Sequence, residues 1–224
     1  MARQFEPLIN PGINAMHTGL ALHPLQRGPS GRPRFLANFT VFGCAGSYGG
    51  QYDAEEWNPD GFGSLAQIIR QDAAWGLVID DPLAGIGTLK TDGPTVTLPY
   101  CWFSAIDWWD NPTLCAVDTY DLSGDSVRFI GRVYNEPDLL AVAKAIEHAR
   151  AHDVPALAGY CVSDNVANDL VRDMPPGIFG VGLQVTAEGD GRERVELESD
   201  AVYRFEVERV GKRWLVASFR VGEE

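Results

Sequence analysis

The sequence has 224 residues, with 18 Lys plus Arg against 31 Asp plus Glu, and therefore a formal net charge of −13. This length suits one large domain or two small ones, and either can bury a hydrophobic core. The acidic balance argues against binding to nucleic acids or anionic membranes, because phosphate contacts need clustered Lys and Arg. No stretch approaches the ~18 consecutive apolar residues of a membrane helix. We therefore expect neither a nucleic-acid partner nor a membrane.

The N-terminal ten residues carry one Arg and no continuous apolar run, so they do not resemble a secretory signal. Four cysteines are scattered along the chain without zinc-ligand spacing: Cys44, Cys101, Cys115 and Cys161. We expect four reduced, mostly buried thiols in a cytoplasmic protein. The chain also lacks the glycine-rich loops that hold nucleotide phosphates, and we expect no cofactor and no metal.

Residues 1–34 are irregular, because five prolines in this span exclude a long helix or a central strand. The same span is too apolar for a disordered tail. We expect an extended arm that packs over the body of its own chain or over a partner subunit.

Residues 35–42 form an aromatic and β-branched run, which predicts a strand. Residues 43–63 are rich in Gly, Asp and Trp and predict a loop. Ser64 stands before residues 65–75, whose apolar positions 65, 68, 69 and 73 have helical spacing. We expect a short helix there, with Ser64 as its N-cap.

From residue 76 to residue 134 the pattern is typical of β-structure. Short turn signals separate apolar runs at regular intervals, which predicts antiparallel hairpins. The predicted strands are 77–80, 86–89, 95–109, 113–122 and 127–134. Residues 35–135 are thus expected to form a β-rich half with one short helix.

Residues 136–224 are expected to form a half made of two helical segments and a hairpin. The first helix starts near Pro137, and one face of it carries Leu139, Val142, Ala143, Ile146 and Ala149. A second helical segment is predicted over residues 155–172, before the Pro-Pro-Gly at 175–177. Three strands follow at 179–187, 194–208 and 213–221, and the last two form a half-buried hairpin. The two halves form either separate units or one compact body.

The end of the chain reads aromatic-x-aromatic, then Gly-x-x-Trp, then apolar, at Tyr203, Phe205, Gly211, Trp214, Leu215 and Val216. This pattern resembles the closing hairpin of NTF2-like (SnoaL-type) domains. The resemblance implies an α+β fold of curved antiparallel sheets, NTF2-like or a related β-barrel. It also implies an apolar pocket for a small apolar or aromatic ligand, and a homodimer.

Residues 100–109 (YCWFSAIDWW) are the densest aromatic segment. Alternate residues of a strand share a face, so Asp107 is expected beside Phe103 and Trp109. Apolar surroundings disfavour the charged form of a carboxyl group and suit it to general acid–base chemistry. The following strand puts Asp118 and Tyr120 on one face, where they could meet Asp107. The alternative is that Asp107 lies solvated at the end of its strand.

These features lead to three hypotheses about function. The first is a cofactor-independent isomerase, cyclase or dehydratase. Its catalytic residues would be Asp107, Asp118, Tyr120 and Tyr100, and its substrate would contact Trp102, Phe103, Trp108 and Trp109. The second is a non-catalytic ligand-binding or oligomer-assembly protein. The third is a serine hydrolase that uses Ser47 in the sequence AGSYGG, although no helix or βαβ unit is predicted around that serine.

Overall fold

In a computed structural model the chain divides into two compact units. Residues 1–102 and 115–133 form the first, which we term the sandwich unit, and residues 103–114 and 134–224 form the second, the helix–sheet unit. The structure describes residues 15–43, 48–58, 61–70, 77–79, 89–102, 104–107, 113–177 and 182–222.

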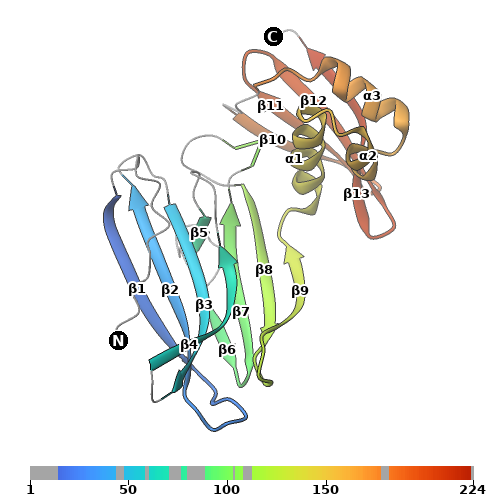
Figure 1. Cartoon of the computed structure of the whole chain (residues 1–224). Coiled ribbons are helices and arrows are strands. Elements are labelled where there is room, and N and C mark those ends of the chain that lie inside the picture. Colours follow the sequence, from blue (N-terminus) through green and yellow to red (C-terminus); the bar gives the residue numbers. More distant parts are fainter. Residues whose placement is uncertain are drawn as a thin grey trace. The chain divides into compact units, whose positions relative to one another are not determined.

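The sandwich unit contains two sheets (Figure 1). Its first sheet is an antiparallel meander of β1 (Ala15–Leu25), β2 (Arg34–Gly43), β3 (Tyr48–Asn58) and β4 (Gly61–Arg70). Its second sheet has five strands: β5 (Leu77–Ile79), β6 (Lys90–Asp92), β7 (Thr95–Trp102), β8 (Leu114–Asp121) and β9 (Arg128–Tyr134). The order is β5-β7-β8-β9, with β6 paired to β7.

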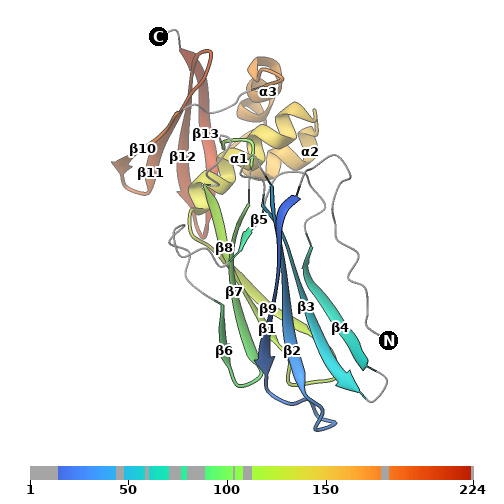
Figure 2. The same ribbon diagram turned by 90° about the vertical axis from the view of Figure 1, so that its left-hand side faces the viewer.

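The two sheets of this unit lie face to face around a shared hydrophobic core (Figure 2). The core residues from both sheets are Leu36, Ala54, Val96, Leu98, Tyr120 and Leu122. Alternation along each strand explains this set, because residues two apart point to the same face of a sheet.

Arg34 connects the first sheet to the second. Its side chain is buried, and Nη1 donates to the carbonyl oxygens of Leu122 and Gly124, both at 2.6 Å. Its Nε donates to Glu56 Oε2 at 2.8 Å. A buried guanidinium needs such partners, because an unpaired charge in the interior is strongly destabilising.

In its described residues the helix–sheet unit has three α-helices, which precede an antiparallel four-stranded meander (Figure 1). The helical elements are α1 (Pro137–Arg150), α2 (Val154–Leu157), the 3-10 helix η2 (Ala158–Tyr160) and α3 (Asp164–Asp173). The strands are β10 (Gly182–Gly189), β11 (Arg192–Glu198), β12 (Val202–Val210) and β13 (Arg213–Gly222).

Helix α1 contacts β11, β12 and β13 through the apolar face predicted from its periodicity. All five predicted residues of that face are buried: Leu139, Val142, Ala143, Ile146 and Ala149. On the sheet, Tyr203, Phe205 and Val207 of β12 are buried while Glu206 between them is exposed. The predicted closing hairpin is therefore confirmed as β12–β13.

Two predictions in the first 75 residues are wrong. The loop expected at residues 43–63 contains β3, and residues 65–70 of the expected helix belong to β4. The pairing of β3 with β4 explains both errors, because a sheet neighbour overrides weak local propensity.

Within the expected arm, residues 15–25 form β1 at the edge of its sheet. Residues 71–76 lie outside the described part of the chain.

Two elements are also more divided than predicted. The helical segment expected at 155–172 breaks at Cys161, whose backbone forms a parallel bridge to Val216 of β13. The strand expected at 194–208 is interrupted by a turn in which Ser199 N donates to the Ala201 carbonyl at 3.0 Å. The first interruption comes from a tertiary contact and the second from a turn hydrogen bond. Hydrophobic periodicity predicts neither of them. The strand expected at 86–89 falls mostly on residues outside those the structure describes.

The α+β class with antiparallel sheets is confirmed. Among the described strands, none of the three sheets closes into a barrel.

We predict that Gly28→Ala destabilises the protein by about 2–4 kcal/mol, since hydrogen bonds to charged groups contribute ~1.5–3 kcal/mol each. A Cβ at Gly28 would overlap the Arg34 guanidinium and force it away from its acceptors. Gly124→Ala is the matched control, because its Cβ would meet nothing closer than 4.0 Å. Urea unfolding measures both, and equal effects would contradict the role of Arg34.

Candidate functional site

Asp118 is a fully buried carboxylate in the sandwich unit. It lies within β8 and is 0 % exposed. Alternate residues of β8 are buried, namely Leu114, Ala116, Asp118 and Tyr120. The two-residue repeat of the strand therefore puts this carboxylate on the face that carries the hydrophobic core. A carboxylate in such a position needs hydrogen-bond partners.

Arg132 of β9 and two tyrosines supply these partners. Arg132 Nε donates to Asp118 Oδ1 at 2.6 Å, and Nη2 donates to Oδ2 at 2.8 Å. The Tyr120 hydroxyl donates to Oδ2 at 2.9 Å, and the Tyr100 hydroxyl lies 3.5 Å from the same oxygen. Of the four predicted catalytic residues, the structure thus brings together Tyr100, Asp118 and Tyr120.

The arrangement favours a protonated Tyr120 beside the ion pair of Asp118 and Arg132. A bidentate arginine–carboxylate pair is among the strongest charge-assisted hydrogen bonds in proteins. Burial, followed by the hydrogen bond to Asp118, raises the pKa of Tyr120 well above its ordinary value. Both oxygens of the carboxylate accept hydrogen bonds within the cluster. The cluster therefore has the chemistry of an internal ion pair that connects β8 to β9.

Aromatic rings flank the guanidinium of this pair. Arg132 Cζ lies 5.5 Å from the ring centroid of Tyr100 and 6.0 Å from that of Phe129, within cation–π range. Phe129 also contacts Tyr120 edge-on, with centroids 5.5 Å apart. Trp102, one of the predicted substrate contacts, packs against Tyr100 with centroids 5.7 Å apart. These contacts hold β9 through side chains as well as through its backbone.

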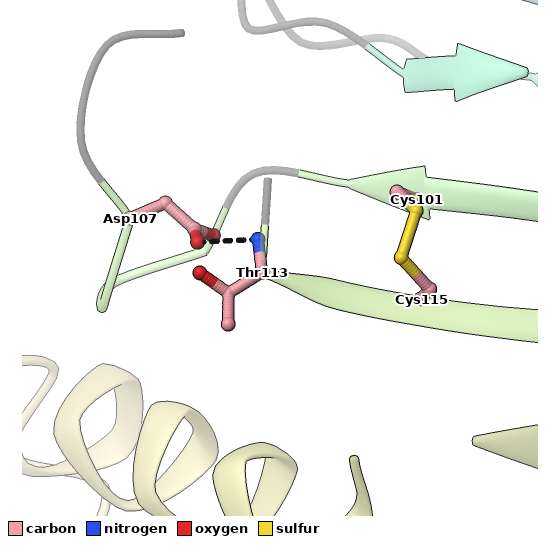
Figure 3. The surroundings of a disulfide bond; sticks show 4 residues. All are labelled: Cys101, Asp107, Thr113 and Cys115. Carbon is pink, nitrogen blue, oxygen red and sulfur yellow. Dashed lines mark hydrogen bonds between the residues drawn. A yellow bond between two sulfur atoms is a disulfide. The ribbon is translucent and has the colours of Figure 1, made fainter. Parts of the chain in front are cut away.

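Asp107 lies outside the strand in which it was expected. Strand β7 ends at Trp102, so the expected strand to residue 109 is wrong and Asp107 lies in a turn. Its Oδ2 accepts from Ser104 N at 2.6 Å and from Ser104 Oγ at 2.8 Å. Its Oδ1 accepts from Thr113 N at 2.6 Å (Figure 3). These bonds connect the described residues Ser104, Asp107 and Thr113 between β7 and β8. Asp107 belongs to the helix–sheet unit, whereas Asp118 belongs to the sandwich unit.

A disulfide joins Cys101, near the end of β7, to Cys115, near the start of β8 (Figure 3). The Cα atoms are 4.0 Å apart, which reflects the pairing of the two strands. The expectation of four reduced thiols is wrong for this pair. Cys161 is free and buried, and burial raises its pKa to about 11. Disulfides are rare in cytoplasmic proteins, so the cysteines no longer support the cytoplasmic location, which stays a prediction.

Several predicted site residues lie outside the described part of the chain. These are Phe103, Trp108 and Trp109 of the expected cavity, and Ser47 of the hydrolase hypothesis. The sequence analysis missed Arg132 and Phe129, which complete the cluster around Asp118. The predicted strands 113–122 and 127–134 are consecutive, which could have indicated a partner for Asp118. A buried acidic residue in one strand needs a basic residue nearby, and the next strand is a natural place to look for it.

The helix–sheet unit contains a second group of carboxyl side chains that the sequence analysis did not single out. Burial, then a hydrogen bond with Asp138, then repulsion from Asp138 and Glu136 raise the pKa of Glu193 on β11 to about 7. Burial and Asp138 also raise the pKa of Glu136, which precedes α1. Asp138 itself is buried in the first turn of α1. Perturbed carboxyl groups occur at functional sites, but they also occur in structural networks.

Among the described residues, no group of three or more His, Cys, Asp or Glu side chains could hold a metal ion. No helix in the described ranges is long and apolar enough to cross a membrane. Comparisons of the chain with protein-family models, with curated proteins and with solved structures gave no match.

We predict that Arg132→Ala destabilises the protein by about 3 kcal/mol, near the lower end of the range for breaking a buried ion pair, because it leaves the Asp118 carboxylate unpaired. The lower end applies because the Arg132 side chain is 38 % exposed. Arg128→Ala is the matched control on the same strand: its side chain is 74 % exposed and pairs with Asp121, so the loss should stay below about 1 kcal/mol. Chemical unfolding distinguishes them, and similar losses would contradict an internal ion pair.

We predict that Glu193→Gln raises the melting temperature by about 2–4 °C at pH 8 and has a smaller effect at pH 5. The pKa of Glu193 is higher in the folded protein than in the unfolded chain. Its contribution to stability is therefore complete below pH ~4.5 and is lost as the pH rises through about 7. A neutral glutamine avoids that loss. Glu198→Gln, on the exposed end of the same strand, serves as the control. A larger gain at pH 5 than at pH 8 would contradict the raised pKa.

Proposed function

We propose that this protein is a non-catalytic assembly protein that associates through the exposed edge strand β9. The observation that carries the proposal is the exposure of three large apolar side chains on one seven-residue strand. Phe129 is 52 % exposed, Ile130 is 54 % exposed and Val133 is 68 % exposed. Large apolar side chains that gather on one exposed strand are typical of interaction sites.

The position of β9 supports pairing through its backbone. In the order β5-β7-β8-β9 it is the last strand, so only one of its edges is paired within the described residues. An unpaired strand edge presents N–H and C=O groups to any chain that approaches in an extended conformation. The ion pair between Arg132 and Asp118 holds the strand in place, so little conformational entropy is lost when a partner binds.

The other edge strands carry features that discourage such pairing. β1 contains Pro24 and has an irregular register with β2, and β4 has two irregularities with β3. β5 has three residues, and β10 is irregular near Gly189. On β13, the Val216 carbonyl accepts a hydrogen bond from Val162 N at 3.0 Å. β9 is seven residues long and contains neither Pro nor Lys.

The acid–base enzyme, with its small apolar or aromatic ligand, stays a prediction. The convergence of Tyr100, Asp118 and Tyr120 supports it. The hydrogen bonds that occupy Asp118 and Asp107 favour structural roles for both carboxylates. We therefore prefer the assembly function.

The NTF2-like relationship also stays a prediction. It is supported by the β12–β13 hairpin, and by helices that precede the sheet in the helix–sheet unit. The homodimer that the resemblance implies agrees with assembly through β9, although the two arguments are independent.

The test is the mass in solution of the double variant Ile130→Lys/Val133→Lys. We expect its association to be at least about tenfold weaker, equivalent to ~1.4 kcal/mol, because two charges replace apolar contacts. The matched control is Val185→Lys/Val210→Lys, which places the same charges on side chains that are 44 % and 50 % exposed in the helix–sheet unit. Light scattering after size exclusion measures the mass. A monomeric parent protein, or an unchanged mass in the β9 variant, would contradict the proposal.

A further inference from the structure

We propose that the disulfide between Cys101 and Cys115 is a reversible thiol–disulfide exchange site, in which Cys115 is attacked first and Cys101 is the resolving cysteine. Exchange at this site goes beyond assembly through β9 and is independent of it. The bond lies on the face of its sheet that points away from the core, and its two cysteines differ in their access to solvent. The segment that the bond closes is also held by a second set of contacts.

The disulfide lies outside the hydrophobic core of the sandwich unit. Tyr120 of β8 belongs to that core, and strand alternation places Cys115, five residues before it, on the opposite face. On β7, the Tyr100 hydroxyl lies 3.5 Å from Asp118 on the core side, so the next residue, Cys101, points to the other side. Opening the bond therefore removes no contact from the core.

The two cysteines differ in their access to solvent. Cys101 is 0 % exposed, whereas Cys115 is half-buried. Exchange requires a thiolate to reach one sulfur of the bond, so access decides which sulfur is attacked. The Sγ atom of Cys115 is therefore the point of entry. Cys101 is the leaving group when the bond is reduced and the resolving thiol when it forms again.

The exchange balances with a dithiol as the reductant. Its first thiolate attacks Cys115 Sγ and forms a mixed disulfide, while the bond between the cysteines breaks with its electron pair on Cys101 Sγ, which takes up a proton. The second thiolate of the reductant attacks the reductant's own sulfur in the mixed disulfide and releases Cys115, which is also protonated. Two electrons and two protons thus pass to the protein, and the reductant leaves as a disulfide.

The fold holds the two thiols together while the bond is open. Strands β7 and β8 are hydrogen-bonded neighbours in their sheet, and the Cα atoms of the two cysteines are 4.0 Å apart. Asp107 connects the segment between these strands by accepting hydrogen bonds from Ser104 and from Thr113 (Figure 3). Groups that are held close in this way react with each other at a high effective concentration, so the bond forms again rapidly.

Single-cysteine variants test the order of attack. In a Cys44→Ser background, Cys101→Ser leaves the half-buried Cys115, and the matched control Cys115→Ser leaves the fully buried Cys101. We incubate each full-length variant with oxidised glutathione and follow the mixed disulfide by peptide mass mapping. We expect Cys115 to be modified at least about tenfold faster than Cys101, because access limits the reaction in the folded protein. Equal rates, or faster modification of Cys101, would contradict the assigned order.

The parent protein gives a second measurement that needs no substitution. We oxidise it with oxidised glutathione, reduce it with dithiothreitol, and quantify the bond by alkylation and peptide mapping. We expect a reduction rate that is proportional to the dithiothreitol concentration and insensitive to urea below the unfolding transition. We also expect the reduced protein to unfold cooperatively and the bond to return on reoxidation. Failure of the bond to form, reduction only at the rate of global unfolding, or loss of the folded state on reduction overturns the exchange site.

Discussion

The buried guanidinium of Arg34 is the interaction on which the sandwich unit depends. It connects the first residue of β2 to the carbonyl oxygens of Leu122 and Gly124, and it also pairs with Glu56 on β3. Because a charge in the interior is tolerated only where every partner is in place, these bonds set how the two sheets meet. The buried glycine at position 28 leaves the space that the guanidinium occupies.

The consequences of this constraint extend to β9. Arg34 holds the segment that leads from β8 toward β9, and the pair between Asp118 and Arg132 then fastens β9 to β8. The apolar side chains of β9 are exposed on a strand that is itself well anchored. A rigid edge of this kind is suited to assembly, since binding orders few additional groups. The acidic residues that first suggest catalysis contribute to the anchoring.

Local pattern predicted some parts of the fold and missed others for identifiable reasons. Helix α1 was predictable because its apolar face repeats over four turns, and the β12–β13 hairpin because its alternation is strong. Strands β3 and β4 could not be predicted in this way, because their pairing with each other stabilises them. A short stretch of sequence does not reveal that pairing. At the candidate site, Asp118 and Tyr120 were predicted to share a face because the strand period is two. Asp107 was misplaced because β7 ends five residues before it.

Local patterns in the sequence predicted the apolar face of α1, the closing hairpin and the common face of Asp118 and Tyr120. All of these depend on periodicities within a single element, which neighbouring residues report directly. Contacts between distant segments, by contrast, establish the pairing of Arg132 with Asp118, the disulfide between Cys101 and Cys115 and the position of β9 at the edge of its sheet. Each of these depends on which strands become neighbours, and strand order is a property of the whole chain that no local periodicity contains.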